Sequence, residues 1–318
     1  MSRMPSHGEP SYDPKRTGSW LVCETCGTQF PTDDEHRITT CFICDDPRQY
    51  VPPSAQSFVT LDALRSSGHK NVFTPIPGDP GRLIAIHSQP KVAIGQRAIL
   101  VRTPRGNVLW DCVTLLDDET IANIKDLGGL EAIVISHPHY YSTHLEWARA
   151  FDCPVYLAAE DREWVAQQDP GYQIFASETE TEVLGTRVLK LGGHFPGSMV
   201  MLFEDRLLIA DTFLTTPSGL GDWDTDAVGT ARERPRGLNS FSFMWSYPNM
   251  IPLPPNELER MWAILKNYEF SSTHGAFPGH DIVKTAGEMK QRVLESMQIQ
   301  IRHSGHGGHK MLDESILR

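Results

Sequence analysis

Four cysteines fall in two pairs near the start of the sequence, Cys23 with Cys26 and Cys41 with Cys44. Two residues lie between the members of each pair, and 14 residues separate the pairs. Two such tight turns facing each other supply four thiolates in a tetrahedron, which is the ligand set of a structural Zn²⁺ ion. Because four thiolates saturate the ion, we expect this site to stabilise a small module rather than to catalyse a reaction.

Two alternatives remain for the same cysteines. A disulfide scaffold is typical of small secreted domains, but the polar N-terminal stretch has no apolar core of a signal peptide. Iron also binds four thiolates, as in rubredoxins, where the segment between the pairs is usually longer. Cys112 and Cys153 adjoin strand-like apolar runs, and we interpret them as buried thiols that pack as small apolar side chains.

Three histidines fall within eight residues in the stretch ISHPHYYSTHLEW, directly after an apolar run. His137 and His139 lie on either side of a proline at the end of a predicted strand, where both imidazoles can point to one side. A single histidine usually satisfies a local hydrogen bond. Two at one strand end supply half of a metal site, provided that other ligands meet them.

Other candidate ligands follow glycine turns or predicted strands further along the chain. His194 lies in GGHFPG, Asp211 ends the LLIAD run, and His274 follows YEFSST. Mixed α/β chains commonly build their sites at the carboxyl ends of strands. We therefore expect these side chains to converge on the two histidines of the HPH segment.

The order of these segments resembles the metallo-β-lactamase superfamily, from about Ile94 to Arg302. The resemblance implies an α/β fold, an αββα sandwich, preceded here by a small zinc ribbon. The paired CxxC motifs, RQYVP, SHPHYY and GGHFPG make the chain similar to a poorly characterised branch. The resemblance also implies that His137, His139 and His194 bind a first metal ion. Asp211, which usually bridges two ions in the family, is then its fourth ligand or the partner of a bound water.

The sequence departs from the family where a second ion would bind. The family motif His-x-His-x-Asp-His has Tyr141 and Ser142 in place of its last two residues, and neither readily replaces a carboxylate or an imidazole as a ligand. We therefore expect one inner ion. His274, the remaining side chain of the second site, is a further candidate ligand. His144 is another if a helix turns it back towards the site, and packing is its alternative role.

Such a site predicts hydrolysis of a small-molecule ester, lactone, thioester or amide. The resemblance implies that a hydroxide bound to an inner Zn²⁺ ion attacks the substrate. Asp211 would orient this hydroxide and move its proton. Tyr141, like Tyr140 beside it, could donate a hydrogen bond to a developing oxyanion, or could simply pack at a helix start. Two other functions fit the residues: a non-haem iron (sulfur) dioxygenase using Fe²⁺, and a catalytically degraded protein that binds a partner.

Predicted strands and helices alternate along the chain and position these residues. The apolar spacing and turn residues predict a hairpin at 98–113, a helix at 117–129, a strand at 130–136, a strand pair at 198–211, and helices at 255–268 and 281–302. The aromatic and proline-rich segment 239–257 predicts a rigid loop, which walls a pocket, plugs the core or forms a dimer interface.

The 318 residues carry a formal net charge of −11 and contain no apolar run long enough for a membrane span. This acidity is not typical of a general nucleic-acid binder. We expect a soluble, cytoplasmic enzyme with a small-molecule substrate, and an oligomer contact is one role left open for the ribbon. The predicted organisation is a disordered lead-in at 1–18, the zinc ribbon at 19–55, a metallo-β-lactamase-like domain at 56–302 and a flexible tail at 303–318.

Overall fold

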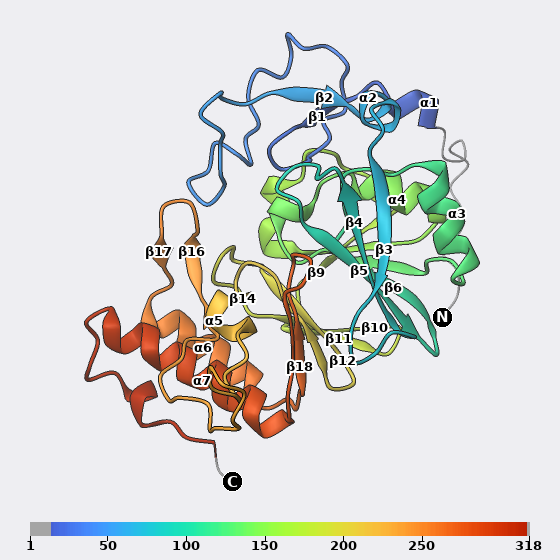
Figure 1. Cartoon of the computed structure of the whole chain (residues 1–318). Coiled ribbons are helices and arrows are strands. Elements are labelled where there is room, and N and C mark those ends of the chain that lie inside the picture. Colours follow the sequence, from blue (N-terminus) through green and yellow to red (C-terminus); the bar gives the residue numbers. More distant parts are fainter. Residues whose placement is uncertain (1–13, 317–318) are drawn as a thin grey trace.

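The computed structural model describes residues 14–316, and two sheets packed face to face form its centre (Figure 1). In the first sheet β3 to β6 are antiparallel and β6 to β9 are parallel. Its strands, in spatial order, are β3 (Lys70–Pro75), β4 (Leu83–Gln89), β5 (Arg97–Thr103), β6 (Gly106–Trp110), β7 (Ala132–Val134), β8 (Val155–Ala158) and β9 (Gln173–Ala176).

The second sheet has six strands, which are antiparallel except for the parallel pair β13 and β18. In spatial order they are β10 (Glu180–Val183), β11 (Thr186–Lys190), β12 (Met199–Phe203), β13 (Arg206–Leu208), β18 (Ser272–His274) and β19 (Asp281–Val283). The predicted hairpin and strand pair therefore form, as β5–β6 and β12–β13.

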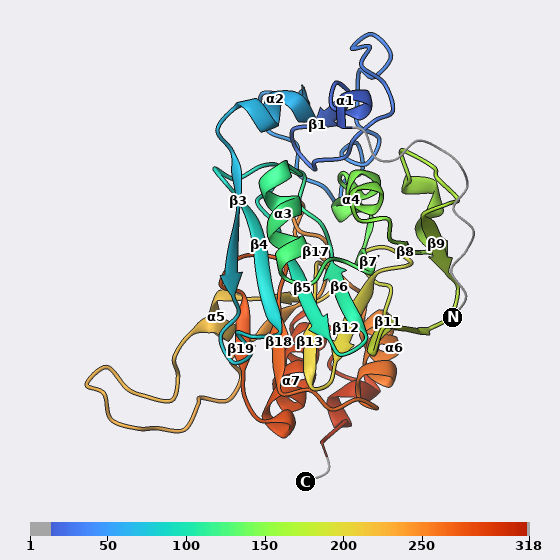
Figure 2. The same ribbon diagram turned by 90° about the vertical axis from the view of Figure 1, so that its right-hand side faces the viewer.

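Side chains that alternate along the strands explain the layering of sheets and helices. In β5, Ile99 and Val101 pack against the second sheet, whereas Ala98 and Leu100 pack on the opposite face. That outer face is covered by α3 (Asp118–Asp126) and α4 (His144–Phe151), and the outer face of the second sheet is covered by α6 (Pro255–Leu265) and α7 (Ala286–His303) (Figure 2). The predicted αββα sandwich is therefore confirmed.

Two segments differ from their predicted structure. The helix predicted from Asp281 begins only at Ala286, because residues 281–283 form the edge strand β19 and the Thr285 side chain caps the helix by accepting from Glu288 N. The segment 239–257 is not loop throughout. It contains three short strands, β15 (Phe241–Ser242), β16 (Met244–Ser246) and β17 (Ile251–Pro252).

These short strands pair outside the two main sheets. β15 pairs with β14 (Leu214–Thr215), and β16 pairs with β17 as a two-stranded hairpin. Pro252 is tolerated in that hairpin because each of its strands has an unpaired edge, where no backbone donor is needed. Phe241 and Phe243 are fully buried and pack on Phe213 in the core between α6, α7 and the second sheet.

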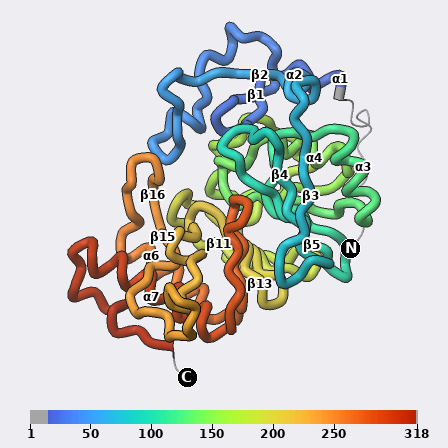
Figure 3. Tube along the Cα trace, in the orientation of Figure 1, coloured from blue at the N-terminus to red at the C-terminus, as the bar shows by residue number. Residues whose placement is uncertain are grey.

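The cysteine-bearing module lies at one end of the sandwich, shown in blue in Figures 1 and 3. Its strand β1 (Leu21–Cys23) pairs with β2 (Phe58–Thr60), so the module extends beyond the predicted boundary at residue 55. Of the predicted lead-in, residues 1–13 lie outside the described part of the chain. The short helices here are α1 (Pro14–Thr17) and α2 (Leu61–Ser66).

Residues 310–316 fold back on α7. Met311 is buried among residues of α6 and α7, and Gln298 Nε2 donates to the carbonyl oxygens of Met311 and Glu314, both at 2.9 Å. The remaining elements are α5 (Pro217–Leu220) and the 3₁₀ helices η1 (Pro138–Tyr140), η2 (Ala159–Trp164) and η3 (Lys310–Asp313). Among residues 14–316, no helix is both long and apolar enough to cross a bilayer.

Candidate metal centres

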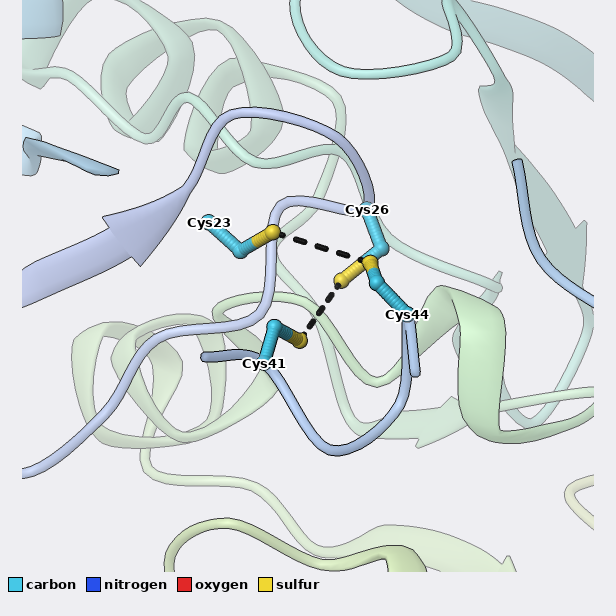
Figure 4. A group of neighbouring side chains, drawn as sticks. All are labelled: Cys23, Cys26, Cys41 and Cys44. Carbon is cyan, nitrogen blue, oxygen red and sulfur yellow. Dashed lines mark hydrogen bonds between the residues drawn. The ribbon is translucent and has the colours of Figure 1, made fainter. Parts of the chain in front are cut away.

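The four cysteines of the module meet in one buried cluster (Figure 4). The Sγ atoms of Cys23 and Cys44 lie 3.7 Å apart, as do those of Cys26 and Cys41. A tetrahedral ion with Zn–S bonds of about 2.3 Å separates its sulfur ligands by about 3.8 Å. All four thiols are free of disulfides, and their spacing fits a four-thiolate metal site.

A tight turn presents each pair of cysteines. Gly27 N donates to Cys23 O across the first turn, and Gly27 has a φ of 81°, a conformation that favours glycine. A Cβ at Gly27 would also lie 2.0 Å from Thr114 Oγ1, so the turn is pressed against the sandwich. In the second turn, Cys44 N and Asp45 N both donate to Cys41 O.

Three histidines and one aspartate meet in a second buried cluster, which we call the inner site. One ligand atom each from His137, His139, His194 and Asp211 lies within 4.8 Å of the others. Asp211 Oδ2 lies 3.3 Å from His137 Nε2, 3.7 Å from His139 Nδ1 and 3.9 Å from His194 Nε2. His139 Nδ1 and His194 Nε2 are 3.2 Å apart.

These separations fit the edges of a small metal tetrahedron, which are about 3.3 Å for bonds of about 2.0–2.1 Å to nitrogen or oxygen. The Nε2 atom of His137 is buried and has no hydrogen-bond partner. An unpartnered imidazole nitrogen aimed at a carboxylate and two other imidazoles is expected of a metal ligand. The inner site therefore fits one cation with three nitrogen donors and one oxygen donor.

The segment before the HPH motif holds His137 in place. The imidazole Nδ1 of His137 lies 2.9 Å from Ser136 Oγ, and Ser136 N donates to Asp111 Oδ1 at 2.7 Å. Asp111 follows β6 with a φ of 58° and is fully buried. Burial raises the pKa of Asp111 to about 7, against the hydrogen bond from Ser136. Such contacts behind a ligand fix which ring nitrogen faces the ion.

Two glycines let His194 enter the inner site. Gly192 and Gly193 have φ values of 65° and 89°, and a Cβ on Gly193 would lie 2.6 Å from Thr212 Oγ1. His194 N donates to that same hydroxyl oxygen. The His194 Nδ1 lies 3.1 Å from the carbonyl oxygen of Met244, so this nitrogen donates to the carbonyl and Nε2 faces the inner site.

Tyr140, and not Tyr141, contacts the inner site. The Tyr140 hydroxyl donates to Asp211 Oδ1 at 2.8 Å, whereas the Tyr141 hydroxyl donates to Asp161 O at 3.4 Å. The reason is the 3₁₀ turn η1, in which residues three apart eclipse each other. His137 and Tyr140 therefore share one side, with ring centroids 4.5 Å apart. The catalytic role predicted for Tyr141 does not fit this geometry.

His144 lies outside the inner site although it is buried. Its Nδ1 donates to Tyr141 O at 2.7 Å, and its Nε2 lies 2.8 Å from Gln173 Nε2. Burial lowers the pKa of His144 to about 4. With both ring nitrogens engaged, His144 fastens the start of α4 to β9. Ser142, at the family's other second-site position, directs its hydroxyl to Gly27 O and Thr114 Oγ1.

His274 is engaged at the end of β18 and is not part of the inner site. Its Nδ1 lies 2.8 Å from Asp281 Oδ1 and its Nε2 lies 2.9 Å from Ser272 Oγ. Asp281 is also paired with Arg97 through both carboxylate oxygens. Burial opposes ionisation of Asp281, but these two partners lower its pKa to about 2. Neither of the further candidate ligands, His144 or His274, joins the inner cluster.

The electrostatics of the inner site suit a cation. Burial lowers the pKa of His139 to about 4, and it holds the pKa of His194 well below the usual value. Both imidazoles are therefore neutral near pH 7, with lone pairs available to a metal. Burial would raise the pKa of Asp211, but the surrounding imidazoles hold it well below its usual range. Two neutral imidazoles beside one ionised carboxylate favour binding of a divalent ion.

Comparison with known proteins gives one curated relative. The chain is 37% identical over 273 residues to the protein named "Uncharacterized protein YmaE" from Bacillus subtilis (strain 168). The aligned region covers 86% of this chain and 93% of the relative. No family model matches the chain.

Several solved structures are distantly similar. The metallo-β-lactamase FIM-1 from Pseudomonas aeruginosa in the mono-zinc form is 15% identical, with a TM-score of 0.44 over 72% of this chain and 95% of that one. A flavo di-iron protein mutant from Thermotoga maritima is 13% identical, with a TM-score of 0.45 over 72% and 61% of the two chains. The 37% identity to YmaE, across most of both sequences, shows that the chain belongs to the family of YmaE.

Proposed function

We propose that this protein is a metal-dependent hydrolase of a small-molecule ester, lactone, thioester or amide, with one zinc ion in the inner site. The observation that carries the proposal is the convergence of three imidazoles and one carboxylate in a buried site, where His137 Nε2 has no hydrogen-bond partner. A zinc ion held by such ligands supplies a Lewis acid and lowers the pKa of bound water to about 7.

Asp211 has the geometry of the residue that orients the attacking water. Its Oδ1 is held by the Tyr140 hydroxyl, so Oδ2 alone faces the imidazoles. Burial raises the pKa of the Tyr140 phenol well above its usual value, so the phenol stays a donor. When a water takes the fourth position on the cation in place of Oδ2, Oδ2 can accept a proton from that water and pass it to a leaving group, while Oδ1 stays fixed.

The partners of the residues at the second-site positions support a single inner ion. Tyr141, Ser142 and His274 each contact protein groups away from the inner cluster. Among residues 14–316, the groups of three or more metal-binding side chains are the four cysteines and the inner site. A mononuclear site suits attack on a carbonyl carbon better than in-line displacement at a phosphodiester, which commonly uses two ions.

The test begins with the metals of the purified protein and continues with a substrate panel of esters, lactones, thioesters and amides. We expect two zinc equivalents and turnover of at least one class, with turnover abolished in His194→Ala. His306→Ala is the matched control, because His306 is exposed and lies outside both clusters; this variant should keep full activity.

Two outcomes would replace the proposal. Iron in the inner site together with sulfur-dependent oxygen uptake would identify a dioxygenase, since histidines and a carboxylate also hold Fe²⁺. A fully zinc-loaded protein that turns over no substrate class, and that binds a partner protein equally well with His194→Ala, would identify a binding protein.

A further inference from the structure

Arg48, from the cysteine module, lies against the inner site. Its Nη1 donates to the backbone oxygen of His194 at 3.1 Å, and its guanidinium carbon lies 3.9 Å from the centre of the Phe195 ring. That ring in turn packs edge-on against the imidazoles of His139 and His194, with centroids 4.9 and 5.2 Å away. One side chain of the module therefore touches both the backbone of an inner ligand and the ring that packs on two of the ligands.

The guanidinium is held in a fixed orientation. Asp46 accepts from Arg48 Nε at 2.7 Å and from Nη2 at 2.8 Å, and it also accepts from the Arg48 backbone N. A bidentate pair fixes the plane of the guanidinium. Trp164 and Trp245 flank it, with ring centres 5.3 and 5.4 Å from the guanidinium carbon. Only 11% of the Arg48 side chain is exposed.

Residues 45–50, which we call the Arg48 loop, are also attached to the β16–β17 hairpin. The Pro47 carbonyl oxygen accepts hydrogen bonds from Ser246 Oγ and Asn249 Nδ2. Figures 1 and 3 show the blue loop meeting the orange hairpin at this point. The same hairpin supplies the Met244 carbonyl that accepts from the His194 ring. Loop and hairpin thus hold His194 from two sides, through its backbone and its imidazole.

The position of the Arg48 loop depends on the cysteine cluster. The loop directly follows Cys44. Phe42, between the cysteines of the second turn, stacks on Trp164 with a centroid distance of 6.3 Å, and Trp164 packs edge-on against Phe195 at 5.4 Å. A continuous series of ring contacts therefore leads from the cysteine turn to the imidazoles of the inner site.

We propose that Arg48 is a positioning residue for the inner metal ligands, and that the cysteine module serves the inner site by holding Arg48 in place. The module is then one wall of the inner site and not only a separate stabilising unit. Because Arg48 acts on His194 and Phe195, its effect is on how tightly the ligand set holds a cation. This proposal is independent of which reaction the inner site catalyses.

The test measures how fast the inner ion passes to a chromophoric chelator from the purified holoprotein. Arg48→Met keeps an apolar stem of similar shape but removes the guanidinium and its donors. We expect the inner ion to leave about 10–100-fold faster, the range over which groups that orient ligands act. Arg48→Lys can still donate to the His194 oxygen, so it should restore part of the slow release. If only the apolar stem of Arg48 mattered, Arg48→Met would release the inner ion at the wild-type rate.

Two matched variants complete the experiment. Arg162→Met removes another guanidinium that lies over an aromatic ring, 3.7 Å from the centre of Phe175, and it should release the inner ion at the wild-type rate. Asn249→Ala removes one attachment of the Arg48 loop and should give a smaller acceleration than Arg48→Met. The cysteine-bound ion, released separately by a thiol reagent, should be retained in all four variants.

Wild-type release from Arg48→Met would overturn the proposal. If Arg48→Met loses both ions because the module unfolds, the release rates of Arg48→Lys and Asn249→Ala decide whether the proposal holds. Release at the wild-type rate from both Arg48→Lys and Asn249→Ala would then overturn it, whereas faster release of the inner ion alone would support it. Because the readout is metal release, failure here would leave the proposed hydrolysis standing, and failure of hydrolysis would leave this result unaffected.

Discussion

The two clusters of metal-binding side chains differ in how the chain assembles them. The cysteines all fall between residues 23 and 44, and two local turns present them. The inner ligands fall between residues 137 and 211, on loops that follow strands of both sheets. The first cluster therefore depends on turn geometry, whereas the second depends on the packing of the whole sandwich.

The two clusters also differ in the chemistry of their ligands, four thiols in one and three imidazoles with a carboxylate in the other. Four thiolates close a coordination sphere, which suits a structural ion. In the inner site one candidate ligand is the Asp211 carboxylate, whose second oxygen accepts from the Tyr140 hydroxyl; under the proposed function this carboxylate also accepts a proton from water. The module has only a small apolar core around its cysteines, whereas the inner site rests on three large clusters of the sandwich. Losing the ion should consequently unfold the module but not the sandwich.

Cys41→Ser should have the largest effect, because it breaks the structural site. Metal binding contributes about 10–16 kcal/mol to small zinc modules, so loss of one thiolate should unfold this one. We expect loss of the cysteine-bound ion and rapid proteolysis between residues 18 and 60. Cys153→Ser changes a buried thiol outside both clusters and should keep both ions. A Cys41→Ser protein that keeps both ions and resists protease would contradict the structural role.

His137→Ala should release the inner ion and leave the module intact. The variant removes the imidazole whose Nε2 lies 3.3 Å from Asp211 Oδ2, and the two sheets do not need that ring to pack. Metal analysis should fall from two equivalents to one, with an unchanged far-ultraviolet circular dichroism spectrum. Two retained equivalents would show that the inner ligands do not bind together as the geometry indicates.

Tyr140→Phe should weaken the inner site without abolishing it. Asp211 Oδ1 loses its donor, and losing such a contact behind a ligand typically costs about 10–100-fold in metal affinity. Chelator competition measures the change. Tyr141→Phe is the matched control, because its hydroxyl makes only a 3.4 Å contact to a backbone oxygen. Equal affinity losses in the two variants would remove the distinction between the adjacent tyrosines.

The same contrast between local and distant assembly explains what the sequence could predict. Cys23 and Cys26 belong to one turn, so their spacing alone places their sulfurs, and the continuous apolar run in β5 likewise identifies a strand buried on both faces. His137, His139, His194 and Asp211 could be grouped because each follows a strand or a glycine turn, and the structure brings them together.

The residues that the sequence could not place depend on local conformation or on distant contacts. The choice between Tyr140 and Tyr141 depends on a 3₁₀ turn, which changes the side-chain period from two to three. Asp111, which has a positive φ, accepts a hydrogen bond from Ser136 N, and Arg48 donates to the backbone oxygen of His194. No spacing in the sequence signals such a pairing. The edge strand β19 was hidden because three residues are too few to show a period.

His144→Gln should have the smallest effect, and it separates a packed histidine from the ligand histidines. The folded protein keeps His144 neutral down to about pH 4, whereas an unfolded chain binds the proton near pH 6.5. Between these pH values the unfolded state therefore binds more protons than the folded state. The contribution of His144 to the free energy of unfolding is lost as the pH falls through that window. Its contribution to the slope is at most about 1.4 kcal/mol per pH unit.

Denaturant unfolding between about pH 5 and 7.5 measures this slope. His144→Gln, which keeps a polar side chain but cannot titrate, should show a shallower fall in the free energy of unfolding than the wild type. His306→Gln changes an exposed histidine and should keep the wild-type slope. The inner imidazoles contribute equally in all three proteins, so the difference isolates His144. Parallel slopes in wild type and His144→Gln would mean that His144 is protonated as readily in the folded protein as in the unfolded chain.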